Sequence, residues 1–503
     1  MTTMIGPLRR AAQVAGDRPA AACGDTVLTH ADAWERCRRL AGALRGLGLA
    51  AGDRVAIVAP NCHRYLEVYQ AVPGAGMVVV PLNQRHATAE LRYALEDSGA
   101  RVLFAGRPVD AVPACVEHVF DLADGYEALL AGAEPADFPD DLSEDTLAGL
   151  FYTGGTTGAS KGVMLTHRNL IANALHYQVC APFTPDTRWL IIAPLFHAAG
   201  SMAVLATVWN GGRNVVLPAF DPGAALDLVE RHRVTDTIAV PTMLAAMAEE
   251  QLARPRDAGS LLRISHGGAP IATETLRRAH AAFPGTELMH IYGATETAPI
   301  ATVFLHEERV LDRPEIRSCG QPAVGVELRV AALDGGPLAA GEVGEVLIRG
   351  DNVMAGYWNK PEQTAAALAD GWYRSGDLGY MDEHAYVYLV DRAKDMIVTG
   401  GENVYSTEVE DVLYRHPAVL EAAVFGIPDP QWGEAVYAAV VPRAPVTEAE
   451  LLEHCRGAIA GYKLPKRIEL RTEPLPKSGA GKVLKRELRA PFWAGQEAMV
   501  AGA

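Results

Sequence analysis

The segment Phe151-Tyr-Thr-Gly-Gly-Thr-Thr-Gly-Ala-Ser-Lys-Gly162 combines four glycines and three threonines with one serine and one lysine. Glycine permits positive φ, so successive N–H groups can converge on an anion, while the hydroxyls and the ammonium add donors and positive charge. The composition predicts a loop that binds a polyphosphate, with ATP or a similar nucleotide as the first candidate. A Walker A loop is excluded, because Ala159 and Ser160 separate Gly158 from Lys161. A flexible surface turn is the alternative for this segment taken alone.

The composition narrows the class of protein. A chain of 503 residues is long enough for several structural units, and its net charge of −16 disfavours nucleic-acid binding, which needs a basic face. Seven scattered cysteines, with no C-x-x-C pair and no zinc-type Cys/His spacing, indicate free thiols in a reducing compartment and no structural metal. The N-terminus lacks an apolar signal region and no apolar run reaches membrane length. We therefore expect a soluble, cytoplasmic protein with no integral membrane segment.

Short apolar runs alternate with helix-like segments from about residue 54 to 300. This alternation predicts parallel sheets covered by helices, and runs without polar alternates indicate strands buried on both faces. Asp221–Arg233 and Ala272–Ala282 show the apolar spacing of helices. The expected strands are Arg54–Ala59, Met77–Pro81, Arg101–Ala105, Trp189–Ala193, Asn214–Leu217, Thr237–Val240, Leu262–Ser265 and Glu287–Ile291.

The pattern changes in three later parts of the chain. The acidic stretch Asp121–Asp145 is interpreted as a surface excursion, and alternating strands and turns from about 320 to 391 predict a small β-rich subdomain. Residues 394–503 have a compact α+β pattern. We expect an α/β fold: a large N-terminal domain (1–391) of helix-covered, mostly parallel sheets that includes the β-rich subdomain, a hinge at 391–394, and a small mobile C-terminal domain (394–503).

Six further motifs follow the Gly-rich loop: Pro194-Leu-Phe-His-Ala-Ala-Gly200, Tyr292-Gly-Ala-Thr-Glu296, Tyr373-Arg-Ser-Gly-Asp-Leu-Gly379, Asp391-Arg-Ala-Lys-Asp-Met-Ile397, Gly400-Gly-Glu-Asn-Val404 and Pro476-Lys-Ser-Gly-Ala-Gly-Lys482. In this order, and over nearly the whole chain, they resemble the adenylate-forming (AMP-binding) superfamily, in its branch of acyl-CoA synthetases and fatty-acid or aromatic-acid CoA ligases. The resemblance implies a two-step ligase that uses ATP, Mg²⁺ and coenzyme A. A carboxylate attacks the α-phosphate of ATP and releases pyrophosphate, and a thiol then displaces AMP.

The resemblance also implies most of the nucleotide site. Glu296 is carried over as the Mg²⁺ ligand, which suits a carboxylate because hard cations prefer oxygen, and Thr295 beside it faces the α-phosphate. A solvated loop carboxylate is the alternative for Glu296, and a surface ion pair is the alternative for Asp377 and Arg392. The family pattern places Thr153, Gly154, Gly155, Thr156, Thr157, Gly158 and Lys161 at the phosphates, Gly267, Gly268, Ala269 and Tyr292, followed by Gly293, at the adenine, and Asp377 and Arg392 at the ribose.

Three other roles follow from the resemblance alone. Lys482 is implied to bring positive charge to the meeting point of carboxylate and α-phosphate, and Lys394 is the implied hinge about which the C-terminal domain rotates. After this rotation, the loop that starts with Gly400 and Gly401 builds a tunnel for the thiol of coenzyme A. His197 is implied as a gate between the nucleotide and acyl sites, and a packed core histidine is its alternative.

Some positions depart from the family pattern or remain ambiguous. Gly154 stands where Ser is usual, Ser160 where Pro is usual, and Ala480 where Thr is usual. A lost hydrogen bond costs about 1 kcal/mol, or up to ~3 kcal/mol with a charged partner, so we expect slower turnover rather than an inactive enzyme. Trp432 is expected to be an aromatic anchor in the core of the small domain rather than a contact to coenzyme A.

The implied acyl pocket predicts the substrate class. Its residues are small or apolar, without a cation for a second carboxylate or an aspartate for an amino group, so we expect a hydrophobic monocarboxylic acid: fatty, aromatic or polycyclic. A thiol on a carrier protein is the alternative to coenzyme A, a non-catalytic nucleotide-binding paralogue is a third interpretation, and a homodimer stays open. The pocket residues are His197, Met202, Val240, Gly267, Gly293, Ala294, Ala298, Pro299 and Ile300.

Overall fold

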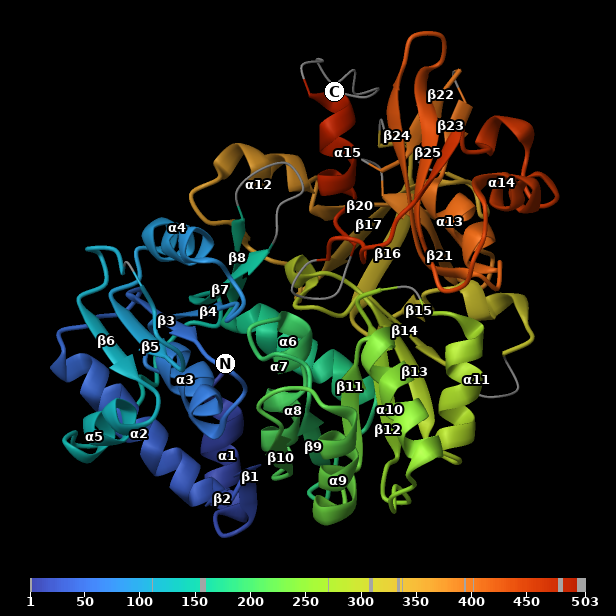
Figure 1. The fold of residues 1–503 in the computed structure, drawn as a ribbon. Helices are drawn as coiled ribbons and strands as arrows, with labels where there is room; N and C mark the ends of the chain where they lie inside the picture. The colour runs from blue at the N-terminus through green and yellow to red at the C-terminus, as the bar shows by residue number, and fades with distance from the viewer. Residues whose placement is uncertain are drawn as a thin grey trace. The chain divides into compact units, whose positions relative to one another are not determined.

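The computed structural model divides the chain into two compact units, whose elements are labelled in Figure 1. The first unit comprises Met1–Arg329, Leu347–Arg374 and His384–Val387; the second comprises Val330–Val346, Ser375–Glu383 and Tyr388–Ala503. The structure describes residues 2–110, 112–153, 160–269, 271–306, 311–332, 335–336, 338–392, 395–400, 402–477 and 483–494.

A nine-stranded sheet forms one half of the first unit. Its neighbouring strands from β13 to β1 are parallel, whereas β2, β14 and β15 add antiparallel edges. In order, the strands are β15 (Gln321–Pro322), β14 (Thr302–Leu305), β13 (Glu287–Tyr292), β12 (Arg263–Gly267), β11 (Asp236–Ala239), β9 (Arg188–Ile191), β10 (Arg213–Val216), β1 (Pro19–Cys23) and β2 (Thr26–Thr29).

Helices bury both faces of this sheet, because successive side chains of a strand point to opposite sides. Leu190 and Ile264 pack into a core with α9 (Pro222–His232), α10 (Pro241–Ala253) and α11 (Thr273–Ala282). On the other face, Tyr177 of α6 (His167–Cys180) shares a 2.7 Å hydrogen bond with the hydroxyl of Ser265 and packs on Trp189. The remaining helices near this sheet are α1 (Gly6–Ala15), α7 (Ala198–Ser201) and α8 (Val204–Trp209).

A seven-stranded sheet forms the other half of the first unit. The apolar strands β3 and β4 lie at its centre and are buried on both faces, and α4 completes their core. The strand order is β18 (Gly356–Tyr357), β8 (Lys161–Thr166), β7 (Leu147–Thr153), β4 (Val78–Leu82), β3 (Arg54–Val58), β5 (Val102–Ala105) and β6 (His118–Asp121). The helices are α2 (His30–Gly46), α3 (His63–Gly74), α4 (Thr88–Ser98), α5 (Asp124–Ala131) and, beside β18, α12 (Pro361–Ala367).

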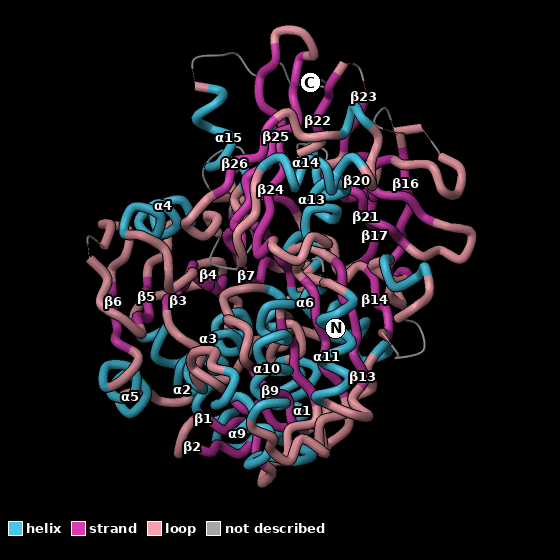
Figure 2. The backbone as a smooth tube through the Cα atoms, turned by 45° about the vertical axis from the view of Figure 1, so that its right-hand side comes forward, coloured by secondary structure: helices cyan, strands magenta, loops and turns pink. Residues whose placement is uncertain are grey.

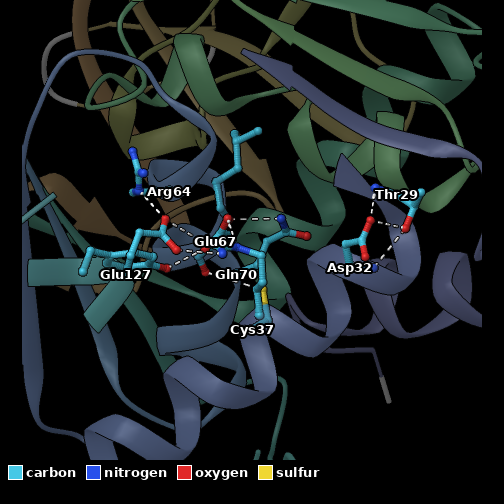
Figure 3. Close-up of polar contacts among 10 residues, drawn as sticks. Thr29, Asp32, Cys37, Arg64, Glu67, Gln70 and Glu127 are labelled. Carbon is cyan, nitrogen blue, oxygen red and sulfur yellow. Dashed lines mark hydrogen bonds and ion pairs between the residues drawn. The ribbon is translucent and has the colours of Figure 1, made fainter. Parts of the chain in front are cut away.

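A polar network around the buried Glu67 joins α2, α3 and α5 (Figure 3). Arg36 donates to the Glu67 carboxylate over 2.9 Å and makes two 2.9 Å hydrogen bonds to Glu127, which also accepts from Arg64 over 2.7 Å. The second oxygen of Glu67 accepts from the Tyr126 hydroxyl over 2.7 Å. Burial raises the pKa of Glu67, and Arg36 opposes this shift. Both Glu67 oxygens are therefore satisfied, as a buried carboxylate requires.

The second unit has its own core. In Figure 2, α13 (Ser406–Tyr414) and α14 (Glu448–Arg456) lie against the sheet of β24, β25 and β26, and α13 and α14 pack with these strands in one apolar cluster. The sheet order is β23 (Glu402–Val404), β22 (Ile397–Thr399), β25 (Gly433–Pro442) and β24 (Val419–Asp429), with β26 (Arg467–Leu470) parallel to β25. Leu488 of α15 (Lys485–Trp493) packs on the other face of this sheet.

The division between the units falls within the strands of a further sheet. Its order is β16 (Val326–Ala331), β17 (Gly344–Gly350), β20 (Trp372–Met381) and β19 (Leu368–Ala369), and β21 (Val387–Arg392) also pairs with β20. The boundary at 391–394 therefore stays a prediction, since residues 330–346 and 375–383 group with the C-terminal residues. Short 3₁₀ helices occur at Thr295–Thr297, Pro314–Arg317 and Gly461–Lys463.

The predicted fold class is confirmed, and the eight predicted strands are present with ends shifted by one or two residues. The prediction for Asp121–Asp145 was incomplete, because this stretch contains α5. Tyr126 and Leu130 of α5 are buried. The acidic composition gave no sign of this helix, because the arginines that bind its Glu127 are distant in the sequence.

Candidate active site

The Gly-rich loop connects the antiparallel strands β7 and β8. Thr153 pairs with Lys161 at the base of the loop, and the Ser160 hydroxyl donates to the Thr153 carbonyl over 2.8 Å. The hydroxyl of Tyr93 donates to the Ser160 carbonyl over 3.1 Å. Ser160, one of the departures from the family pattern, thus helps to close the loop base. The predicted phosphate contacts Gly154, Gly155, Thr156, Thr157 and Gly158 lie outside the described residues.

Tyr357 lies between Lys161 and Glu296. Its hydroxyl donates to Oε1 of Glu296 over 2.9 Å, and the Lys161 ammonium lies 4.5 Å from the centroid of its ring. Burial and the nearby Glu296 carboxylate raise the pKa of Tyr357, so the phenol remains a proton donor. The structure thus brings the predicted lysine of the loop and the predicted metal ligand to one aromatic side chain.

The segment that carries Tyr357 is held by backbone hydrogen bonds on both sides. Met354 N donates to the Glu296 carbonyl over 2.8 Å, Ala355 N to Met164 over 3.0 Å, and Trp358 N to Gly162 over 2.8 Å. The last two bonds join the short strand β18 to β8. This antiparallel pairing places residue 357 beside the base of the Gly-rich loop.

Two buried asparagines fix the same region. Asn352 donates from Nδ2 to the carbonyls of Thr297 over 2.7 Å and Ile300 over 2.6 Å. Asn169 donates to the carbonyls of Asp351 and Val353 over 2.8 and 2.7 Å. The sequence analysis missed Asn169, Asn352 and Tyr357. The available signal, an aromatic pair after Gly356, is equally typical of a core strand.

Four parallel strands bring most predicted adenine and acyl residues to one sheet edge. Val240 directly follows β11, Gly267 ends β12, Gly293 follows β13, and His197 follows β9 at the start of α7. These strands are consecutive neighbours, so their carboxyl ends lie together, where ligands of open α/β sheets bind. Gly268 lies near Val240, since a Cβ on Gly268 would lie 3.9 Å from Cγ1 of Val240.

Close backbone packing explains why two positions at this edge are glycine. A Cβ on Gly267 would lie 2.1 Å from the Ile291 carbonyl oxygen, and one on Gly293 would lie 1.8 Å from the Pro299 carbonyl oxygen. Both distances are far inside van der Waals contact, so the close approach of backbones alone demands glycine. Ala269, Tyr292, Ala294 and Thr295 are half-buried, whereas Met202, Ala298, Pro299 and Ile300 are buried.

Asp377 and Arg392 form an ion pair in the second unit, with Arg392 Nε 2.7 Å from Asp377 Oδ1. The Asp377 side chain is buried and lies on β20, whereas Arg392 ends β21. The pairing agrees with the alternative of an ion pair, although the burial of Asp377 departs from a surface position. Their ribose contacts stay predictions.

Gly400 and Trp432 pack on each other in the second unit. Gly400 has φ of 60°, its N–H donates to the Trp432 carbonyl over 2.9 Å, and an added Cβ would lie 2.8 Å from the indole ring. The Trp432 side chain is 42% exposed and faces Lys466, whose Nζ lies 5.6 Å from the ring. The expectation of a core anchor was therefore wrong. Lys394, Gly401 and Lys482 lie outside the described residues, so their roles stay predictions.

Family models match most of the chain. The AMP-binding enzyme model covers residues 8–358, and the model of the AMP-binding enzyme C-terminal domain covers residues 408–482. The chain belongs to the AMP-binding enzyme family.

Individual relatives refine this assignment. A feruloyl-CoA synthase from an Amycolatopsis species is 43% identical over 97% of this chain and 98% of its own length. A fatty acid–[acyl-carrier-protein] ligase from Streptomyces coeruleorubidus is 36% identical over 94% of this chain and 93% of its own. The o-succinylbenzoate CoA synthetase of Bacillus subtilis, solved with its acyl-adenylate intermediate, superimposes with a TM-score of 0.89 at 32% identity over 97% and 98% of the two chains. Within its family, this chain is an AMP-forming acid–CoA ligase.

The donor set at Glu296 fits Mg²⁺. The structure shows a half-buried carboxylate with Oε1 held by Tyr357, and it gives Oε2 no hydrogen-bond donor within the described residues. No group of three or more His, Cys, Asp or Glu side chains suited to a metal occurs in the part of the chain that the structure describes. A single carboxylate suits Mg²⁺, which often binds to one or two carboxylates and substrate phosphates rather than in a protein cage. The same Bacillus subtilis synthetase has been solved with ATP and a magnesium ion.

Among the described residues, no helix has the length and apolar composition needed to cross a bilayer.

Proposed function

We propose that this ligase joins a hydrophobic monocarboxylic acid to coenzyme A, with an aromatic acid of the cinnamate kind as the first candidate. In the first step, a carboxylate oxygen bonds to the α-phosphorus of ATP and pyrophosphate leaves. In the second, the thiol sulfur bonds to the acyl carbonyl carbon, and AMP leaves with the electron pair of the broken C–O bond. The apolar residues Met202, Ala298, Pro299 and Ile300 at the sheet edge, and the feruloyl-CoA synthase among the relatives, support this substrate class.

The observation that carries the proposal is the convergence of Lys161, Tyr357 and Glu296 beside the loop base. Lys161 and Thr153 would contact the β- and γ-phosphates, and Glu296 would hold Mg²⁺ through its carboxylate. The bound ion would neutralise phosphate charge. Fixed donors and charges are the main contribution that a protein makes to phosphoryl-type displacement.

Lys482, outside the described residues, is proposed to serve the first step only. Lys482→Ala should abolish acid-dependent pyrophosphate release but spare thioester formation from supplied acyl-adenylate. Equal loss of both half-reactions would contradict this role.

The choice of acid is testable with purified protein. Incubation with ATP, Mg²⁺, coenzyme A and one of ferulate, cinnamate, benzoate, octanoate or palmitate should give pyrophosphate and a thioester, identified by mass, with the highest kcat/KM for a cinnamate. A higher kcat/KM for octanoate or palmitate would replace the aromatic acid by a fatty acid.

The acceptor has a second candidate, because one relative is a fatty acid–[acyl-carrier-protein] ligase. Acyl transfer to a phosphopantetheinylated carrier protein should be slower than transfer to coenzyme A. Faster transfer to the carrier protein would favour that candidate. Pyrophosphate release without either thioester would exclude both acceptors.

A further inference from the structure

Tyr357 touches both charged groups of the proposed phosphate and metal site while Lys161 and Glu296 do not pair with each other. Its hydroxyl is 2.9 Å from Glu296 Oε1, and its ring centroid is 4.5 Å from Lys161 Nζ. Within the described residues, no ion pair joins Lys161 to Glu296 or to any other carboxylate. The two charged groups therefore share one aromatic side chain instead of pairing directly.

Further hydrogen bonds hold the chain on both sides of Tyr357. Its own N–H donates to the Thr364 hydroxyl over 2.9 Å, and the indole N–H of the adjacent Trp358 donates to the Asp97 carbonyl over 3.0 Å. Tyr357 as a whole is 7% exposed. These bonds add to those of Met354 and Ala355, so the backbone that carries the phenol is held in place by the protein itself.

The two contacts have different consequences for a bound nucleotide. A hydroxyl that holds Oε1 restricts rotation of the Glu296 carboxylate and leaves Oε2 without a donor among the described residues. A ring face attracts the ammonium of Lys161 without neutralising its charge, as an ion pair would. The lysine thus keeps its charge for a phosphate, and the carboxylate keeps one oxygen for a cation.

We propose that Tyr357 is a positioning residue of the nucleotide site, which orients the Glu296 carboxylate for Mg²⁺ through its hydroxyl and holds Lys161 apart from that carboxylate through its ring. This inference rests on the proposed role of Glu296 as the metal ligand. Two substitutions separate the contacts. Tyr357→Phe removes the hydroxyl and keeps the ring, whereas Tyr357→Leu removes both.

The test is a calorimetric titration of the full-length protein with α,β-methylene-ATP, once in excess Mg²⁺ and once in EDTA. Tyr357→Phe should weaken binding about tenfold in Mg²⁺, the size expected for one hydrogen bond to a charged group, and leave binding in EDTA unchanged. Tyr357→Leu should weaken binding in both conditions. A mere packing defect would lower both affinities to the same extent in Tyr357→Phe.

Tyr126→Phe is the matched control. The Tyr126 hydroxyl, like that of Tyr357, donates to a glutamate carboxylate, here Glu67 over 2.7 Å. It contacts neither Glu296 nor Lys161, so this variant should bind the analogue as the wild type does in both conditions. Thermal unfolding of each variant checks that it is folded.

Glu296→Gln distinguishes failure of the inference from failure of its premise. If Glu296→Gln weakens binding in Mg²⁺ and Tyr357→Phe does not, Tyr357 has no positioning role. If neither variant changes the Mg²⁺ effect, Glu296 is not the metal ligand. If the inference holds, Tyr357→Phe in the Glu296→Gln background should add little further loss, because the two groups act through one contact.

Discussion

Two clusters in the first unit use the same three kinds of side chain to different ends. In the α2–α3–α5 network, a carboxylate (Glu67), a phenol (Tyr126) and a cation (Arg36) satisfy one another, and Glu67 is 2% exposed. Beside the Gly-rich loop, the side chains of Glu296 and Lys161 both contact Tyr357, and no ion pair joins them within the described residues. A carboxylate with all its hydrogen bonds satisfied supports the fold, whereas a carboxylate oxygen and an ammonium that have no partner among the described residues remain available for a ligand.

The largest expected effect comes from breaking the cluster of Arg36, Glu67 and Tyr126. Glu67→Ala removes the buried partner of Arg36, leaves the Tyr126 hydroxyl without its acceptor, and should lower the free energy of unfolding by about 3 to 5 kcal/mol. Urea unfolding measures the change, and kcat of the folded enzyme should stay near that of the wild type. A stability loss below about 1 kcal/mol would mean that this network does not support the fold.

The corresponding change at Glu296 should lower activity and leave stability unchanged. Glu296→Gln keeps the shape of the side chain but removes its charge, and we expect kcat/KM for ATP to fall by about 100-fold, as for loss of one electrostatic group in an active site. Pyrophosphate release at saturating acid provides the rate, and urea unfolding should give the wild-type midpoint. Wild-type activity would remove Glu296 from the site.

Matched removal of one hydroxyl sharpens the contrast. Tyr126→Phe deletes the 2.7 Å hydrogen bond to Glu67 and should destabilise the fold by about 1.5 to 3 kcal/mol, since the acceptor is charged and buried. Its affinity for the ATP analogue should be unchanged. If Tyr126→Phe instead altered Mg²⁺-dependent binding, the two clusters would be coupled.

The smallest effect concerns pH. Burial, with Arg64 and Arg36 nearby, lowers the pKa of His63 from 6.5 to about 4. Between pH 6.5 and 4, His63 is therefore protonated in the unfolded chain but neutral in the folded protein. Its contribution to the free energy of unfolding is complete above pH 6.5 and is lost as pH falls towards 4. His63→Gln should reduce the loss of unfolding free energy between pH 6.5 and 4.5. An identical pH profile would show that His63 does not contribute.

The predictable part of the fold had local signals. The run Arg54–Val58 has no polar alternate, which indicated a strand buried on both faces, and the structure confirms it at the centre of its sheet. The helix α5 lacked such a signal. Its buried Tyr126 is recognisable only beside Glu67, a residue far away in the sequence.

The site divides in the same way. The motif that ends in Glu296 and the loop that contains Lys161 could be found from residue order, but Tyr357 could not, because its importance lies in contacts with both. Backbone pairing of β18 with β8 places Tyr357 beside the loop base, and such pairing between distant segments cannot be predicted from the order of residues. The structure also corrected Trp432, whose exposure depends on where Gly400 packs.

The sequence by itself determined the α/β class, the family and the chemical groups available for a polyphosphate, since periodic apolar runs and ordered motifs are properties of neighbouring residues. Only the tertiary structure decided which carboxylate is saturated and which keeps an oxygen to spare. The physical reason is that hydrogen-bond satisfaction depends on distances between groups many residues apart, which chain order does not specify.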